Sequence, residues 1–320
     1  MTSVELAQLS NAAVYATMIS LSIAMVCFAV SFALGRRRPA VATGPRAVVE
    51  QAEGSTAVLT RTETTVDETP DAGRRWANVG MSMTWLSFLT LLFGVVLRGL
   101  WAGRVPWGNM YEFSITAALG ILGVFLIMSI GRDLRWLGLF IVIPALLTLG
   151  LAVTVLYTEA AQLVPALKSY WLVIHVSAAI ICSGAFTLAA ATAGLSLLRS
   201  RAERKSADVT GWLTRVPSAD KLRTMTNRII AFTFPLWTFA VVAGAIWAEN
   251  AWGRYWGWDP KETWAFITWV VFAAYLHARS TAGWRADRAS WIVIAGWAAF
   301  MINYFGVNIF VNSLHSYAGM

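Results

Sequence analysis

Charged residues are scarce in this chain of 320 residues, and their scarcity excludes a soluble globular protein. Asp, Glu, Lys and Arg make up 13% of the sequence, about half of their share in soluble domains. Hydrophobic residues make up 58%, and the mean hydropathy is +0.60. Folding alone could not hide so much apolar surface from water. We therefore expect lipid to be the solvent for much of the protein.

Cysteine is rarer still, which excludes a fold held together by disulfides. Cys27 and Cys182 lie far apart, each inside an apolar run, and the sequence has no CxxC pair. Free Cys commonly behaves as a small buried hydrophobe, so we expect both to be packing residues. The N-terminus has no basic segment before its first apolar run, so we expect no cleaved signal peptide. The net charge of +8 does not indicate nucleic-acid binding, because the basic residues lie between apolar runs.

Eight apolar stretches are long enough to cross a bilayer, which takes about 20 residues at a rise of about 1.5 Å each. They are residues 11–34, 77–97, 113–131, 136–156, 171–198, 229–248, 264–282 and 290–310. We therefore expect an all-α fold, a polytopic membrane helix bundle of about eight transmembrane helices.

The basic residues predict the orientation of this bundle, because Lys and Arg concentrate in cytoplasmic segments. If both termini lie outside, 20 of the 25 Lys and Arg residues fall in inner segments. The opposite orientation would place only 5 of them there. The sequence therefore predicts that both termini lie outside.

Three regions are expected along the chain. Residues 1–34 form the first transmembrane helix. Residues 35–76 are polar and lack an apolar period, so we predict a disordered cytoplasmic linker. Residues 77–320 form a seven-helix domain, with an external loop at residues 249–264 that carries the strongest functional signal.

That external loop is exceptionally rich in aromatic residues. They are Trp252, Tyr255, Trp256, Trp258 and Trp264. A belt at the membrane interface needs one or two aromatic residues at each helix end, not four indoles in one loop. Glycines between the rings let the backbone turn tightly, so the rings can line one surface for a large, flat ligand. Asp259 followed by Pro260 predicts the start of the next helix. An interfacial aromatic loop and a sugar-binding platform are the alternatives.

Histidine occurs only three times, as His175, His277 and His315. By the predicted topology, His175 lies within roughly 8 Å of the outer surface, and His315 lies just beyond the last span. These two can meet near the Trp-rich loop and bind a cofactor between them, as haem iron accepts two axial imidazoles. His277 lies roughly 20 Å deep in the seventh span. It is either a functional residue or a neutral histidine bonded to a neighbouring helix. If it binds haem, another chain must supply the second ligand, or the iron is five-coordinate.

The loop also matches a known motif. Its run Trp252-Gly-x-x-Trp256-x-Trp258-Asp259-x-x-Glu262 resembles the tryptophan-rich WWD motif of haem-handling proteins. Three further segments agree, namely Pro-x-Gly-Asn-Met-Tyr-Glu-Phe at 106–113, Ser-Tyr-Trp-x-x-x-His-Val at 169–176 and Leu-His-Ser-Tyr-Ala-Gly at 314–319. Residues 77–320 as a whole resemble the CcsA/ResC-type subunit, also called CcsB, of cytochrome c biogenesis system II.

This resemblance implies a function. The protein would transport haem b to the outer membrane face and hold it for thioether attachment to the CxxCH motif of apocytochrome c. His175 and His315 would be the external axial ligands. His277 would be an intramembrane ligand, with its mate supplied by the partner subunit. The loop residues that would cradle the porphyrin are Trp252, Trp256, Trp258 and Asp259.

The resemblance also implies partners and a location. The partners would be a ResB/Ccs1-type membrane subunit, apocytochrome c and thiol-reducing proteins of the same pathway, and the chain would be part of a holocytochrome c synthase (haem lyase) complex. The location would be the plasma membrane of a bacterium, with a thylakoid membrane as the alternative. Two other functions are a proton-coupled or small-molecule transporter with His277 as a relay, and a glycan-handling protein. The first predicts further acids deep in the spans, which the sequence lacks, and the second predicts a paired external carboxylate site.

Overall fold

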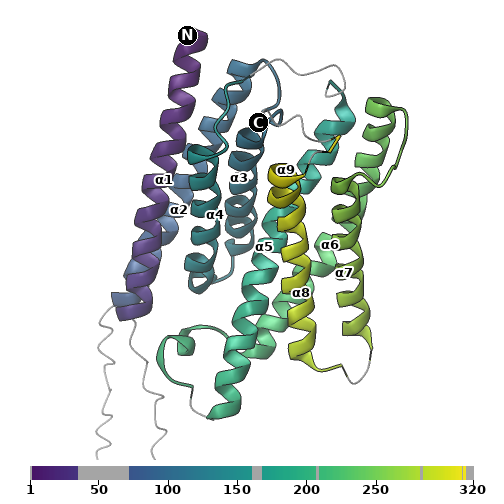
Figure 1. Ribbon diagram of the computed structural model, residues 1–320. Helices are drawn as coiled ribbons and strands as arrows, with labels where there is room; N and C mark the ends of the chain where they lie inside the picture. Colours follow the sequence, from purple (N-terminus) through teal and green to yellow (C-terminus); the bar gives the residue numbers. More distant parts are fainter. Residues whose placement is uncertain are drawn as a thin grey trace, which may run out of the picture.

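The structure is a computed structural model, and the secondary structure that it describes is helical throughout (Figure 1). It describes residues 2–34, 72–160, 168–206, 209–281, 284–311 and 313–314. The long helices are α1 (Ser3–Leu34), α2 (Ala72–Ala102), α3 (Met110–Ser129), α4 (Gly138–Thr154), α5 (Tyr170–Lys205), α6 (Ala219–Trp252), α7 (Pro260–Ser280) and α8 (Ala286–Met301). The short ones are η1 (Arg135–Leu137), η3 (Gly211–Arg215), the π-helical η4 (Ile302–Gly306) and α9 (Val307–Phe310).

The predicted polytopic helix bundle is confirmed. Within the described ranges, seven helical stretches are long and apolar enough to cross a membrane. The predicted seventh span corresponds to α7, which has 21 residues but is not among those seven. Its first turn contains Lys261 and Glu262, and its last contains His277 and Arg279. The described part of the chain therefore has eight long helices, and α7 is the one that is not apolar enough to be counted as a span.

Two predicted boundaries differ from the observed ones. Helix α2 begins at Ala72, so residues 72–76 of the predicted linker are helical, and residues 35–71 lie outside the described part of the chain. The aromatic loop is shorter than predicted, because α6 continues to Trp252 and α7 begins at Pro260. Both differences have the same cause: polar residues extend these helices beyond their apolar spans.

The start of α1, the end of α6, the start of α7 and α9 lie toward the same end of the bundle, which we call the site end (Figure 1). The ends of α5 and α7 and the starts of α6 and α8 lie toward the opposite end (Figure 1). Beneath the site end, the stacked rings of Phe186 and Phe272 join α5 to α7, with centroids 4.1 Å apart. Trp237 and Phe300 contact Phe186 edge-on, so α6 and α8 join the same aromatic core.

Helices α3 and α5 approach each other closely through two glycines. A Cβ atom added at Gly184 would lie 2.5 Å from the carbonyl oxygen of Gly120. A Cβ atom added at Gly120 would lie 2.8 Å from the carbonyl oxygen of Ile180. Small residues at a membrane helix crossing let the backbones come together. This contact fixes the distance between two helices that line the site described below.

We predict that Gly184→Ala lowers the free energy of unfolding by about 1–3 kcal/mol, because its methyl group would push the α3 and α5 backbones apart. Gly194→Ala is the matched control on the same helix, since nothing lies within 4 Å of its Cβ position. It should leave stability unchanged or raise it by up to about 1 kcal/mol through helix propensity. Thermal unfolding in detergent, followed by circular dichroism, measures both. Equal midpoints for the two variants would contradict the prediction.

Candidate functional site

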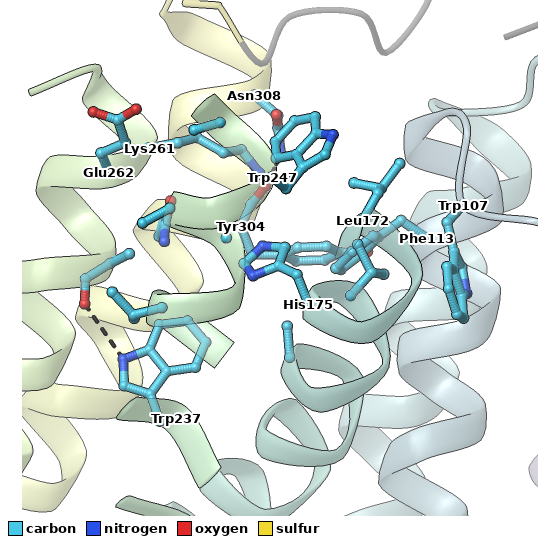
Figure 2. Close-up of a pocket in the computed structure, with 18 of the residues that line it drawn as sticks. Trp107, Phe113, Leu172, His175, Trp237, Trp247, Lys261, Glu262, Tyr304 and Asn308 are labelled. Atoms are coloured by element: carbon cyan, nitrogen blue, oxygen red, sulfur yellow. Dashed lines mark hydrogen bonds between the residues drawn. The ribbon is translucent and has the colours of Figure 1, made fainter. Parts of the chain in front are cut away.

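A cavity lies at the site end of the bundle, between α3, α5, α6, α7 and the η4–α9 segment (Figure 2). Its empty space, part of which is open to solvent, is about 1130 Å³. The aromatic residues that line it are Trp107, Phe113, Trp237, Trp247, Tyr255, Trp256, Phe300 and Tyr304. Binding sites for small molecules and cofactors are typically concave and mostly apolar, with few polar groups, and this cavity fits that description.

His175 lies in this cavity in a defined orientation. Ser169 caps the start of α5 by accepting a hydrogen bond from the Trp171 N–H at 3.2 Å, which places His175 in the second turn. The Nδ1 atom of His175 lies 2.7 Å from the carbonyl oxygen of Ala240. A carbonyl only accepts, so Nδ1 carries the proton, and in the neutral ring the lone pair is on Nε2. Such a bond to the second ring nitrogen orients a metal-ligating histidine.

The helix facing His175 is shaped to receive its ring. A Cβ atom added at Gly244 of α6 would lie 2.7 Å from Nδ1 of His175, so only glycine leaves the ring in place. One turn further along α6, the ring of Trp247 is nearly parallel to the imidazole, at 13° with centroids 6.5 Å apart. Figure 2 shows the imidazole near the centre of the cavity, with Trp247 and Trp237 on either side of it. Helix α6 therefore fixes both the position and the tautomer of the imidazole.

The start of α7 forms one wall of the cavity, and a buried carboxylate fixes it. Asp259 is the N-cap of the helix and accepts a hydrogen bond from the Lys261 N–H at 3.3 Å. Glu262 completes a capping box by accepting the N–H groups of Asp259 at 3.1 Å and Gly257 at 2.8 Å. The guanidinium of Arg254 pairs with Glu262 at 3.3 Å. The backbone of the aromatic loop is thus tied to the first turn of α7.

The start of α3 forms the opposite wall in the same way. Asn109 is the N-cap, and its side chain accepts the Glu112 N–H at 2.8 Å. The fully buried Glu112 carboxylate accepts the Gly108 N–H at 2.8 Å and pairs with Arg104 at 2.6 Å and with Arg98 at 3.1 Å.

The two walls share one sequence spacing. In each, the arginine precedes the glutamate by eight residues and the N-cap precedes it by three, as in Arg104-x-x-x-x-Asn109-x-x-Glu112 and Arg254-x-x-x-x-Asp259-x-x-Glu262. This shared arrangement of arginine, N-cap and glutamate was not predicted from the sequence, although the capping role of Asp259 was.

The predicted loop residues occupy different positions around the cavity. Trp256 lines it, whereas Trp252 ends α6 and packs against Trp247 with centroids 4.9 Å apart. Trp258 is 64% exposed and has a φ of 59°, a left-handed backbone conformation that is uncommon for a bulky residue. Its ring contacts Trp256 edge-on at 5.7 Å. Asp259 is buried as the N-cap, and it also accepts the Leu314 N–H at 2.9 Å.

Of the other two predicted histidines, only His277 is described, and it does not join His175. His277 lies near the end of α7 with its side chain exposed on the surface of the bundle, at the end opposite the cavity. His315 lies outside the described residues. Cavity residues that the sequence analysis did not name as candidates include Trp107, Gly244, Trp247, Lys261 and Tyr304. Gly244 and Trp247 are one helical turn apart, so the sequence places them on the same face of α6. That spacing was the signal that could have identified them.

A family model described as cytochrome C assembly protein matches residues 107–315, which contain the described residues that line the cavity. The chain belongs to this family. Similar curated proteins are named cytochrome c biogenesis protein CcsA, so this cytochrome c assembly protein is of the CcsA type. The one from Guillardia theta is 36% identical over 260 residues, covering 75% of this chain and 85% of its own. The one from Picosynechococcus sp. is 34% identical over 295 residues, covering 75% and 86%.

The fold of this cytochrome c assembly protein is also found in a solved structure. The cytochrome c haem lyase CcmF aligns with 95% of this chain at a TM-score of 0.62 and 15% identity. The chain spans 47% of the length of that protein. At this identity the likeness concerns the fold alone.

We predict that Glu112→Gln lowers the free energy of unfolding by about 3–5 kcal/mol, because it leaves buried Arg98 without its neutralising partner. Glu159→Gln, at an exposed position before α5, is the matched control and should change stability by less than about 0.5 kcal/mol. Thermal unfolding in detergent tests the pair. A midpoint for Glu112→Gln within a degree of the control would show that this carboxylate does not hold the α3 wall.

Proposed function

We propose that this protein holds haem b in the cavity around His175 and presents it for thioether attachment to the CxxCH motif of apocytochrome c. Membership of the cytochrome c assembly family gives the protein a role in cytochrome c maturation. The proposal that haem binds at this site rests on the hydrogen bond from His175 Nδ1 to the Ala240 carbonyl oxygen, inside a cavity with aromatic walls. It leaves the ring as an Nε2 ligand, the form in which imidazole binds haem iron.

The residues present fit such a ligand. Eight aromatic residues line the space, and aromatic faces suit a flat conjugated macrocycle. Gly244 leaves room for the imidazole against α6, where any side chain would displace it. Lys261, Asn303 and Asn308 add a few polar groups to a mostly apolar wall. An apolar site with a few placed polar groups is what an amphipathic cofactor requires.

The chain's part in the reaction is to position the reactants. Adding a thiol to a vinyl group forms one carbon–sulfur bond and one carbon–hydrogen bond and releases nothing. Such a step gains most from holding the two partners in one geometry. The capped starts of α3 and α7 supply rigid walls for that purpose, and their carboxylates are already engaged by N–H groups and arginines.

We assign the second external ligand to His315, as the resemblance implies. Leu314, the residue before it, donates its N–H to Asp259 at the start of α7, the wall that carries Lys261. We assign to His277 a second haem site shared with a ResB/Ccs1-type partner subunit, and its exposed side chain on α7 supports that assignment. We place the external cavity on the outer face of a bacterial plasma membrane, with thiol-reducing proteins of the pathway supplying reduced apocytochrome c.

In a complex whose second proposed haem site is removed by His277→Ala, we expect His175→Ala to lower haem occupancy more than about tenfold, as for loss of a metal's oriented ligand. Added imidazole should restore the Soret band, because the vacated space lies where the ring was. A variant that keeps its full Soret band without imidazole would refute the site. The visible spectrum of the complex purified with its partner subunit provides the measurement.

Gly244→Ala tests the same site without touching the ligand. Its methyl group would displace the His175 ring from Ala240, so haem affinity should fall about tenfold or more, in the range of lost outer contacts to a ligand. Gly150→Ala is the control, since nothing lies within 4 Å of its Cβ position. Haem titrations followed by absorbance compare the two, and equal affinities would contradict the proposed geometry.

A further inference from the structure

Lys261 is the one cation among the described residues that line the cavity. It is the second residue of α7, after the N-cap Asp259 and the first helical residue Pro260, and its side chain is half-buried. Figure 2 shows that side chain directed into the cavity. The neighbouring Glu262 also lines the cavity, but its carboxylate is paired with Arg254. The cavity thus has a positive charge on its α7 wall.

No anionic side chain of the described chain pairs with the Lys261 ammonium. Glu262 is engaged by Arg254 and by two backbone N–H groups. Asp259 accepts the N–H groups of Lys261 and Leu314, and in the described part of the chain neither acid forms a hydrogen bond or ion pair with the ammonium. The arginines at the site end differ, because Arg98, Arg104 and Arg254 each pair with a glutamate.

This arrangement is costly unless an anion enters the cavity. Burial lowers the pKa of Lys261 to about 8, although the nearby Asp259 carboxylate opposes the shift. A cation taken out of water without a partner loses free energy of hydration, which a bound carboxylate would restore through a charge-assisted hydrogen bond.

The wall beside Lys261 also offers polar groups. Asn303 is 8% exposed and lines the cavity. Its Oδ1 atom, which has no hydrogen-bond partner in the described structure, is an acceptor and cannot bind a carboxylate oxygen, whereas its amide nitrogen can donate to one. Asn308 lines the same cavity five residues later, and its amide nitrogen donates one N–H to the Tyr304 carbonyl oxygen at 2.6 Å and has a second N–H to donate. In an α-helix, residues five apart face different directions, but the π-helical η4 segment, with its i→i+5 bonds, brings them toward one face. The π-helix therefore gathers polar side chains on this wall.

We propose that Lys261, with Asn303 and Asn308 beside it, binds the propionate carboxylates of haem and thereby sets the orientation of the macrocycle. This inference rests on the proposed function, because it names the polar end of the same site. Haem carries both propionates on one edge and its vinyl groups elsewhere on the ring. Figure 2 shows Lys261 on one side of His175 and Trp107, Phe113 and Leu172 on the other. With the propionates at Lys261, the vinyl groups face that second, apolar side, where the thiols of the substrate must reach them.

The test compares haem with haem dimethyl ester, in which both carboxylates are masked. Each is titrated into the purified complex with its partner subunit, and the Soret band at the His175 site reports binding. We expect the unaltered protein to bind haem at least tenfold more tightly than the ester. Lys261→Gln should bind haem no more tightly than the unaltered protein binds the ester, and Lys261→Arg should keep most of the preference for haem.

Lys168→Gln is the matched control, because Lys168 is an exposed lysine at the same end of the bundle. It should retain the full preference, and thermal unfolding of each variant checks that it is folded. Equal affinity of the unaltered protein for haem and ester, or a preference that survives in Lys261→Gln, would overturn the inference. Either result would leave the haem site itself intact. Loss of binding of both compounds in the unaltered protein would instead overturn the proposed function.

Discussion

Two buried carboxylates, Glu112 and Glu262, determine where the walls of the cavity begin, and the site depends on both. Glu112 accepts one backbone N–H and Glu262 accepts two from the loop before its helix, and each neutralises an arginine eight residues upstream. A loop tied to a helix start in this way has few conformations available. The indole of Trp256 and the ring of Trp107 are carried on these two loops, so their separation across the cavity is set by the ion pairs beneath them. His175 then lies between two walls, each of which is held by its own ion pair and helix cap.

The pairing of charges at the site end also explains why the cavity is mostly apolar. Each arginine at this end of the bundle is paired with a glutamate, and the acids are occupied by N–H groups and arginines. Among the described residues that line the cavity, Lys261 is the one cation, and the carboxylate of Glu262 is paired with Arg254. A neutral imidazole, aromatic faces and one ammonium together define a ligand that is flat, apolar over most of its area, able to bind nitrogen and acidic at one edge. Haem, the ligand that we propose for this cavity, has each of these properties.

Much of this could be read from the sequence, because lipid imposes a simple rule on length and composition. The apolar runs located the long helices, and Asp259-Pro260 located the start of α7. The rule fails where polar residues continue a helix beyond its apolar span, as at Ala72–Trp76 and at Trp252. It also cannot tell which face of an apolar helix points inward. Lipid and protein core accept the same side chains, so the exposed position of His277 and the inward position of Gly244 had no signature in hydropathy. The exposed position of Trp258 goes with a left-handed backbone conformation, which amino-acid composition does not predict.

The π-helical segment from Ile302 to Gly306 affects how such a cavity can change in evolution. A π-turn holds one residue more than an α-turn, so its origin is most simply an insertion. Deleting one residue there would restore regular winding and swing everything after it, Asn308 included, by about 100° around the helix axis. Substitutions leave that register untouched. The shape of this wall therefore depends on the number of residues in the final helical segment. A homologous chain one residue shorter at this point would enclose a different pocket even if its other side chains were the same.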